Sequence, residues 1–137
     1  MRLFKSSEYA IRCLVYMARC GDEICSVKRL SDALEIPYKF LGRLMSRLGA
    51  AGIVTAVHGK HGGYHIARPL DQLRLVDIID VVEGMESYDR CILGFETCDD
   101  ENPCPMHERW TEQKRRIVAM LETTTLADLA REPGKRI

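Results

Sequence analysis

Three cysteines lie close together in the second half of the chain, in the segment CILGFETCDDENPCPMH. Six residues separate Cys91 from Cys98, five separate Cys98 from Cys104, and His107 follows three positions later. Thiolates are soft donors that suit iron–sulfur clusters and zinc. Because three thiols leave a four-coordinate centre one ligand short, the pattern predicts a metal site completed by a donor of another kind.

Two other uses of the same thiols stay open. His107 could close a zinc site with the three cysteines, or the thiols could act through thiol–disulfide chemistry. The spacing is not the C-x2-C of most zinc sites and bacterial ferredoxins. Three unused thiols are the least favoured interpretation, because exposed clustered thiols oxidise readily.

Charge is distributed unevenly along the 137 residues, although the chain as a whole is neutral. Residues 1–68 hold 11 basic and 5 acidic residues, and residues 69–137 hold 9 and 15. This asymmetry indicates a nucleic-acid or membrane surface on the basic half. No apolar run is long enough to cross a bilayer and no secretory signal opens the sequence, so we expect a cytoplasmic protein with no membrane partner.

The basic half predicts a helix-turn-helix. Amphipathic spacing predicts a helix over residues 7–20, which Ser6 or Ser7 could cap. A short second helix should start at the cap Ser26, and a third near Pro37. The third helix would bury Leu41, Leu44, Met45 and Leu48. Two helices with a short connection, the second of them basic, fit a helix-turn-helix.

A β-hairpin is expected directly after these helices. Residues 53–57 and 64–67 are short apolar runs on either side of the turn HGKHGG. A hairpin in this place is a wing, so the two features together predict a winged helix-turn-helix that binds double-stranded DNA. Arg43 is the candidate for a guanine, while Lys28, Arg47 and Lys60 suit phosphates. The full set of candidate DNA-binding residues is Lys28, Lys39, Phe40, Gly42, Arg43, Arg47, Lys60, His61 and Gly62.

The acidic half predicts a helix over residues 71–83, an irregular segment over 85–105 and a longer helix over 106–122. A final short helical turn is expected over 125–130. The long helix carries apolar residues that would need a partner subunit, namely Trp110, Ile117 and Leu121. The expected fold is mainly α with a small β-hairpin, divided into a winged helix-turn-helix domain (1–69) and a cluster-binding loop and dimerisation region (70–137).

Together these segments resemble the winged-helix family of bacterial Fe–S transcription regulators that includes IscR, NsrR and RirA. The resemblance covers roughly residues 1–130 and rests on the pattern L-x-x-A-G-I-V…G-x-x-G-G-Y, from Leu48 to Tyr64, and on the three-cysteine loop. It implies a homodimer on a pseudo-palindromic promoter site, with the long C-terminal helix crossing its partner. It also implies a cluster on the three cysteines, whose state shifts promoter affinity in response to iron, redox or nitric oxide status.

The resemblance leaves two candidates for the fourth ligand. IscR-like members resemble this chain at His107, whereas NsrR-like members use a carboxylate from the first helix of the other subunit, where Glu8 stands here. The C-x6-C spacing differs from the C-x5-C of both. A 4Fe-4S cluster with Glu8 is preferred, and a 2Fe-2S cluster with either ligand stays open. Gly42 stands where IscR-like members carry a Glu, so the operator need not match that of IscR.

An enzyme is not expected, because the sequence has no Gly-rich phosphate loop, no G-x-S-x-G and no H-E-x-x-H. An electron carrier would need no basic helix-turn-helix and usually supplies four cysteines. The sequence therefore predicts a DNA-binding transcription regulator controlled by an iron–sulfur cluster. The alternative is a winged-helix regulator with a zinc or thiol-redox sensor at the same cysteines.

Overall fold

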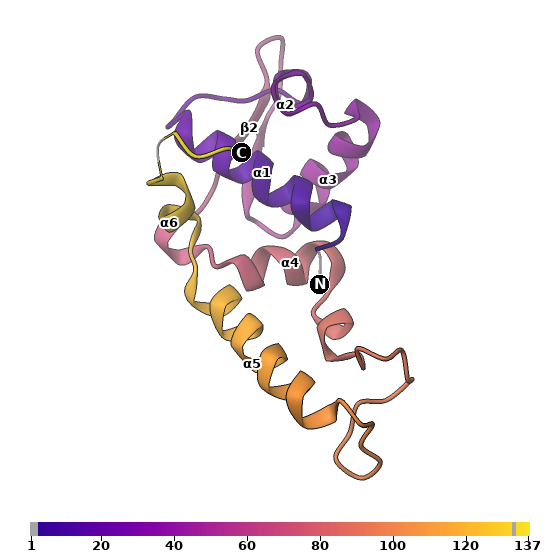
Figure 1. Ribbon diagram of the computed structural model, residues 1–137. Helices are drawn as coiled ribbons and strands as arrows, with labels where there is room; N and C mark the ends of the chain where they lie inside the picture. Colours follow the sequence, from indigo (N-terminus) through magenta and orange to yellow (C-terminus); the bar gives the residue numbers. More distant parts are fainter. Residues whose placement is uncertain (1–2, 133) are drawn as a thin grey trace.

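The computed structural model describes residues 3–132 and 134–137, so the first two positions of the predicted N-terminal domain lie outside the described residues. The chain is mainly helical with a two-stranded antiparallel hairpin, as the sequence predicted (Figure 1). The α-helices are α1 (Lys5–Arg19), α2 (Val27–Leu34), α3 (Tyr38–Ala50), α4 (Leu75–Glu83), α5 (His107–Thr123) and α6 (Leu126–Ala130). The strands are β1 (Val54–Val57) and β2 (Gly63–Ile66), and two 3-10 turns are η1 (Leu70–Gln72) and η2 (Glu86–Asp89).

Helices α1, α2 and α3 contain the helix-turn-helix. Together with the hairpin of β1 and β2 they are called the winged part below. Ser26 caps α2 as predicted, since its hydroxyl accepts from the Arg29 backbone N–H at 3.0 Å. The predicted Ser cap of α1 is wrong: Phe4 occupies the cap position without a side-chain bond, and Ser7 is buried inside the helix. The Arg12 guanidinium donates to the Leu34 carbonyl at 2.9 Å and so joins α1 to the end of α2.

The wing is fastened to the segment before α2. Its register pairs Val54 with Ile66 and Val57 with Gly63. Cys25 and Tyr64 exchange two backbone hydrogen bonds, of 2.9 and 2.8 Å. At Gly63 a Cβ would stand 2.5 Å from the Cys25 carbonyl oxygen, so this close approach requires glycine. The hairpin is therefore held in a fixed position beside α2 and α3.

One large core joins the winged part to α4 and α6. It contains residues of α1, α2 and α3 together with Leu73, Ile78, Val82 and Leu126 from the second half of the chain. The core thus extends past residue 69 into the second half of the chain, and the domain boundary expected there stays a prediction.

The helix predicted over 71–83 is divided in two by long-range pairing. Leu73 is extended, and its carbonyl oxygen accepts from the Leu126 N–H at 2.8 Å. At the start of α4 the Asp77 carboxylate accepts from the Arg74 backbone N–H at 3.3 Å and from its guanidinium at 2.8 Å. Residues 73 and 74 leave the helix because they pair with the link between α5 and α6, which includes Thr125.

Helix α5 leads away from the winged part and carries the loop before it to the far end of the molecule (Figure 1). It packs on α4 through a small cluster of Ile79, Tyr88 and Leu121. The prediction that Leu121 needs a partner subunit is wrong, because this side chain is 4% exposed within its own chain. Met120 beside it is 55% exposed. Among the described residues, no helix is long and apolar enough to span a membrane.

Candidate DNA-binding surface and thiol site

The outer face of α3 gathers three of the predicted DNA-binding residues. Lys39, Gly42 and Arg43 line one shallow hollow with Val27, Tyr38 and Ser46. Lys39 and Arg43 are exposed, and a Cβ at Gly42 would meet no atom within 4 Å. Because glycine weakens a helix interior by roughly 1 kcal/mol relative to Ala, its use here is a cost to stability. The missing side chain leaves the α3 backbone open to close approach from outside.

Three other predicted residues already have contacts within the chain. Arg47 donates to the Val82 carbonyl oxygen at 2.6 Å, and Lys28 pairs with Asp32 at 3.0 Å. The ring of Phe40 meets that of Tyr9 edge-on, with centroids 5.5 Å apart. The contacts of Arg47 and Phe40 could not be predicted from local sequence, because their partners, Val82 and Tyr9, lie on other helices.

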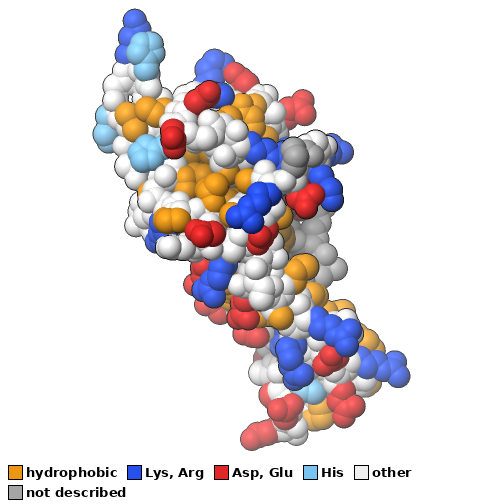
Figure 2. All heavy atoms as spheres, turned by 90° about the vertical axis from the view of Figure 1, so that its left-hand side faces the viewer, with side chains coloured by type: hydrophobic (Ala, Val, Ile, Leu, Met, Phe, Trp, Pro, Cys, Tyr) orange, Lys and Arg blue, Asp and Glu red, His pale blue; other side chains and the backbone are white. Residues whose placement is uncertain are grey.

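The wing tip projects from the molecule and is basic. Figure 2 shows Lys or Arg and His side chains at the projecting end, and Lys60 and His61 are both exposed. At Gly62 a Cβ would collide with the Val57 carbonyl oxygen, so the tight turn requires glycine there. Lys39, Arg43 and Lys60 are all exposed, the first two on α3 and the third at the wing tip.

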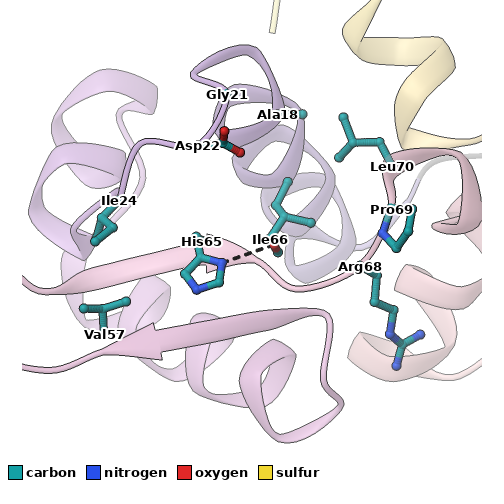
Figure 3. A pocket seen from close by; sticks show the side chains of 10 residues that line it. All are labelled: Ala18, Gly21, Asp22, Ile24, Val57, His65, Ile66, Arg68, Pro69 and Leu70. Atoms are coloured by element: carbon teal, nitrogen blue, oxygen red, sulfur yellow. Dashed lines mark hydrogen bonds between the residues drawn. The ribbon is translucent and has the colours of Figure 1, made fainter.

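A pocket lies between the end of α1, the wing strands and η1 (Figure 3). Arg68 at its edge donates to the carbonyl oxygens of Ala51 (2.7 Å) and Gly52 (3.2 Å) and so holds the turn between α3 and β1. Of the described residues that line this pocket, none is a predicted site residue.

The predicted metal ligands meet as two pairs in the loop before α5. The Sγ atoms of Cys91 and Cys104 are 3.6 Å apart. The Sγ of Cys98 is 3.6 Å from Nδ1 of His107, whose Nε2 is 2.9 Å from the Asp100 carboxylate. Within residues 3–132 and 134–137, no three His, Cys, Asp or Glu side chains are already gathered as a metal site. Asp100 was not foreseen, since an irregular loop gives no periodic signal.

The surroundings of Cys91 favour a thiolate. Burial acts to raise the pKa of this thiol, which is 6% exposed. Hydrogen bonds from the backbone N–H groups of residues 93–95 and from the Cys104 thiol outweigh it, so the pKa of Cys91 lies below its ordinary value. N–H groups directed at sulfur are also what a metal-bound thiolate uses. The donor types in this loop therefore suit a metal ion or cluster that prefers soft ligands such as sulfur.

The two candidates for a fourth ligand lie in different places. His107 is the first residue of α5, is 9% exposed and faces Cys98. Glu8 lies on α1 in the winged part and pairs with Lys5 at 3.3 Å. The segment between η2 and α5, which carries the three cysteines and is called the thiol loop, lies at the end of α5 away from the winged part (Figure 1). Of these two candidates, both in the described part of the chain, His107 is the one beside the thiols.

Two of the three cysteines before residue 69 are of another kind, while the third, Cys20, is half-buried and accepts from the Arg29 guanidinium at 3.5 Å. Cys13 and Cys25 are completely buried in the core. Burial raises the pKa of Cys13 to about 12 and also raises that of Cys25. Both act as small apolar residues in the core.

A family model described as an iron-dependent transcriptional regulator, Rrf2, matches residues 3–132. The chain belongs to the Rrf2 family of transcriptional regulators. It is 32% identical over 140 residues to protein rrf2 of Nitratidesulfovibrio vulgaris, covering 96% of this chain and 89% of that one. The family assignment confirms the prediction of a transcription regulator in place of an enzyme.

Two solved structures share the fold of this chain, which confirms the predicted winged helix. CymR, described as the global cysteine regulator of B. subtilis, superposes with a TM-score of 0.78 at 28% identity, covering 95% of this chain and 96% of that one. IscR of T. potens superposes with a TM-score of 0.76 at 26% identity, covering 100% and 93%. Both share the fold, so the signal must be argued from the loop residues.

Proposed function

We propose that this Rrf2 regulator adjusts its promoter affinity through an iron–sulfur cluster held by Cys91, Cys98, Cys104 and one ligand that is not a thiol. The observation that carries the proposal is that three thiols and His107 lie next to the start of α5 as two contacting pairs, Cys91 with Cys104 and Cys98 with His107. When bound, such a cluster supplies redox chemistry and an exchangeable position at the iron that lacks a thiolate. That position makes the site responsive to iron, oxidants or nitric oxide.

His107 is the fourth ligand that this geometry favours. Its Nδ1 already faces the Cys98 sulfur, and Asp100 on Nε2 would fix the ring and its tautomer. Glu8 could contribute only from the partner subunit, because in its own chain it belongs to the winged part. A 4Fe-4S and a 2Fe-2S cluster both remain candidates, to be told apart by spectroscopy.

For DNA, we place α3 in the major groove and the wing on the backbone. Lys39, Phe40, Gly42 and Arg43 would approach base edges from the first half of α3. Phosphate contacts would come from Lys28, Arg47 and Lys60, with His61 and Gly62 at the wing tip. A homodimer would place its two α3 helices about 34 Å apart, one turn of DNA, on a two-fold symmetric site. Sedimentation of the full chain at micromolar concentration as a monomer would contradict the homodimer.

The route from the loop to α3 runs along the end of α4. Arg47 of α3 bonds the Val82 carbonyl oxygen, and the next residue, Glu83, accepts from the Tyr88 hydroxyl at 3.2 Å. Tyr88 belongs to η2, directly before the thiol loop. A change in the loop could therefore shift α3, provided that the two states differ in DNA affinity. Reduced thiols of this kind fit the cytoplasm.

A thiol-redox regulator at the same cysteines is the second candidate. The 3.6 Å contact between Cys91 and Cys104 and the similarity to the cysteine regulator CymR both favour it. A zinc site of the three cysteines and His107 is a further form of this alternative.

The test is anaerobic purification of the full chain, with absorbance, electron paramagnetic resonance and analysis of iron, sulfide and zinc. We expect brown protein containing iron and sulfide. His107→Ala should change the spectrum, while Glu8→Ala is its matched control and should not. If Glu8→Ala alone changes it, the ligand comes from the partner subunit. Colourless protein that contains zinc, or no metal, contradicts the cluster.

A further inference from the structure

We propose that the metal-free thiol site is also an oxidation site, at which Cys91 and Cys104 form a disulfide while Cys98 stays reduced. The inference rests on the proposed function only in that the same thiols would hold the cluster. The two Sγ atoms are 3.6 Å apart, and a small movement brings them to the S–S bond length of about 2.05 Å.

Fixed elements bring these two thiols together. The indole N–H of Trp110 donates to the Arg90 carbonyl oxygen at 3.0 Å, which holds the residue before Cys91 against α5. The Cys104 carbonyl oxygen accepts from the His107 N–H at 2.9 Å, at the start of the same helix. Both thiols are therefore anchored to the first turns of α5, and their contact does not depend on chance closure of the loop.

Cys98 contacts a different partner from this pair. Its sulfur contacts Nδ1 of His107, and Asp100 fixes the other side of that ring. Chain entropy alone would favour the shorter loops, which link Cys98 to Cys91 or to Cys104. The structure instead favours the Cys91–Cys104 disulfide, which closes the longest of the three possible loops. A preference for this pairing therefore distinguishes a preformed site from random oxidation.

The oxidant is a hydroperoxide, and Cys104 is the accessible side of the pair. Cys104 is half-buried and lines a hollow with Phe95 and Pro105. One thiolate attacks a peroxide oxygen, the O–O bond breaks, and a sulfenic acid forms as the alcohol or water leaves. The second thiol then attacks the sulfenic sulfur, the S–S bond forms and water is released. Two thiols and one hydroperoxide thus give one disulfide, one alcohol (water in the case of hydrogen peroxide) and one water.

Oxidation would block reloading of the metal. With Cys91 and Cys104 joined, only Cys98 and His107 are left as ligands in the loop. Iron uptake should then wait until a dithiol reductant has cleaved the disulfide.

The test uses the full chain, freed of metal anaerobically with a chelator and a reductant, desalted, and treated with one equivalent of hydrogen peroxide. Remaining thiols are blocked with N-ethylmaleimide. Trypsin and glutamyl endopeptidase then place each cysteine in a separate peptide, covering residues 91–96, 97–101 and 102–108. Mass spectrometry should find peptides 91–96 and 102–108 linked, at least about fivefold above either other pairing, with Cys98 blocked.

Equal amounts of the three pairings, a majority of disulfides through Cys98, or three blocked thiols would overturn the inference. Trp110→Phe keeps an aromatic ring but removes the N–H donor, so it should reduce the preference for this pairing; an unchanged preference would refute the anchoring by α5. If the disulfide forms in protein that never binds iron, the cluster proposal fails and this inference stands. If the cluster assembles but the pairing is absent, only this inference fails.

Discussion

The guanidinium of Arg47 on α3 donates to the carbonyl oxygen of Val82 near the end of α4, at 2.6 Å. Val82 is buried, so few other donors can reach this oxygen. The contact joins the helix proposed to enter the major groove to the helix that leads into the thiol loop. Arg47, which the sequence predicts to contact a DNA phosphate, thus also links α3 to α4 within the protein.

Replacing Arg47 with Ala should therefore lower the stability of the protein itself. A buried carbonyl oxygen that loses its donor costs about 1–3 kcal/mol. Thermal unfolding of Arg47→Ala should show a lower Tm than the parent protein, whereas Arg43→Ala, on the exposed face of the same helix, should keep the parent value. Equal Tm values for both variants would show that the Arg47–Val82 contact contributes nothing.

Arg43→Ala should weaken binding to the protein's own promoter by about 1–3 kcal/mol and relax the preference at one base pair. The physical reason is the loss of two hydrogen bonds to a guanine edge. Gel-shift titrations against a set of single-base operator variants measure both effects. Arg115→Ala, an exposed Arg of α5, is the control and should change neither. Unchanged affinity and preference in Arg43→Ala would refute the role of α3.

Lys60→Ala should weaken binding to all DNA sequences about equally. A wing-tip cation that neutralises one phosphate releases about one counterion, so the slope of log affinity against log salt should fall by about one unit. Titrations at several salt concentrations measure it. A sequence-dependent loss with an unchanged slope would contradict a phosphate contact.

The start of α4 should make stability depend on pH in acid. Hydrogen bonds from the Arg74 side chain hold the pKa of Asp77 below its usual value of about 4. A carboxyl whose folded-state pKa is depressed contributes stability that is fully present above the unfolded-state pKa and is lost as the pH falls through the folded value. Denaturant unfolding of the parent protein should lose this contribution below about pH 4. Asp77→Asn should be less stable at neutral pH and should lack that part of the acid dependence; identical pH profiles would rule out the contribution.

Local rules recover most of the winged part from the sequence. Ser26 caps α2, the apolar face of α3 is buried as its spacing requires, and glycines mark the hairpin turn. These features depend on residues close together in the chain. The break at Leu73 and the burial of Leu121 depend instead on pairing with distant segments, which no local pattern encodes.

The thiol loop shows the same limit. The sequence identifies its donors, Cys91, Cys98, Cys104 and His107, because their types and spacing carry the chemistry. It does not reveal that they meet as two pairs, because that grouping depends on the Trp110–Arg90 contact and on Asp100 in an irregular loop.

Control of promoter binding by the three cysteines is tested most directly by measuring the promoter affinity of one anaerobic preparation, first with its metal site loaded and again after iron removal. Protein in which Cys91, Cys98 and Cys104 are all Ala is measured beside it. We expect the promoter affinities of loaded and metal-free protein to differ by about tenfold or more, a coupling of about 1.4 kcal/mol. The triple variant should behave as the metal-free form in both conditions. If the triple variant binds the promoter just as the iron-loaded protein does, control of DNA binding by these cysteines is contradicted.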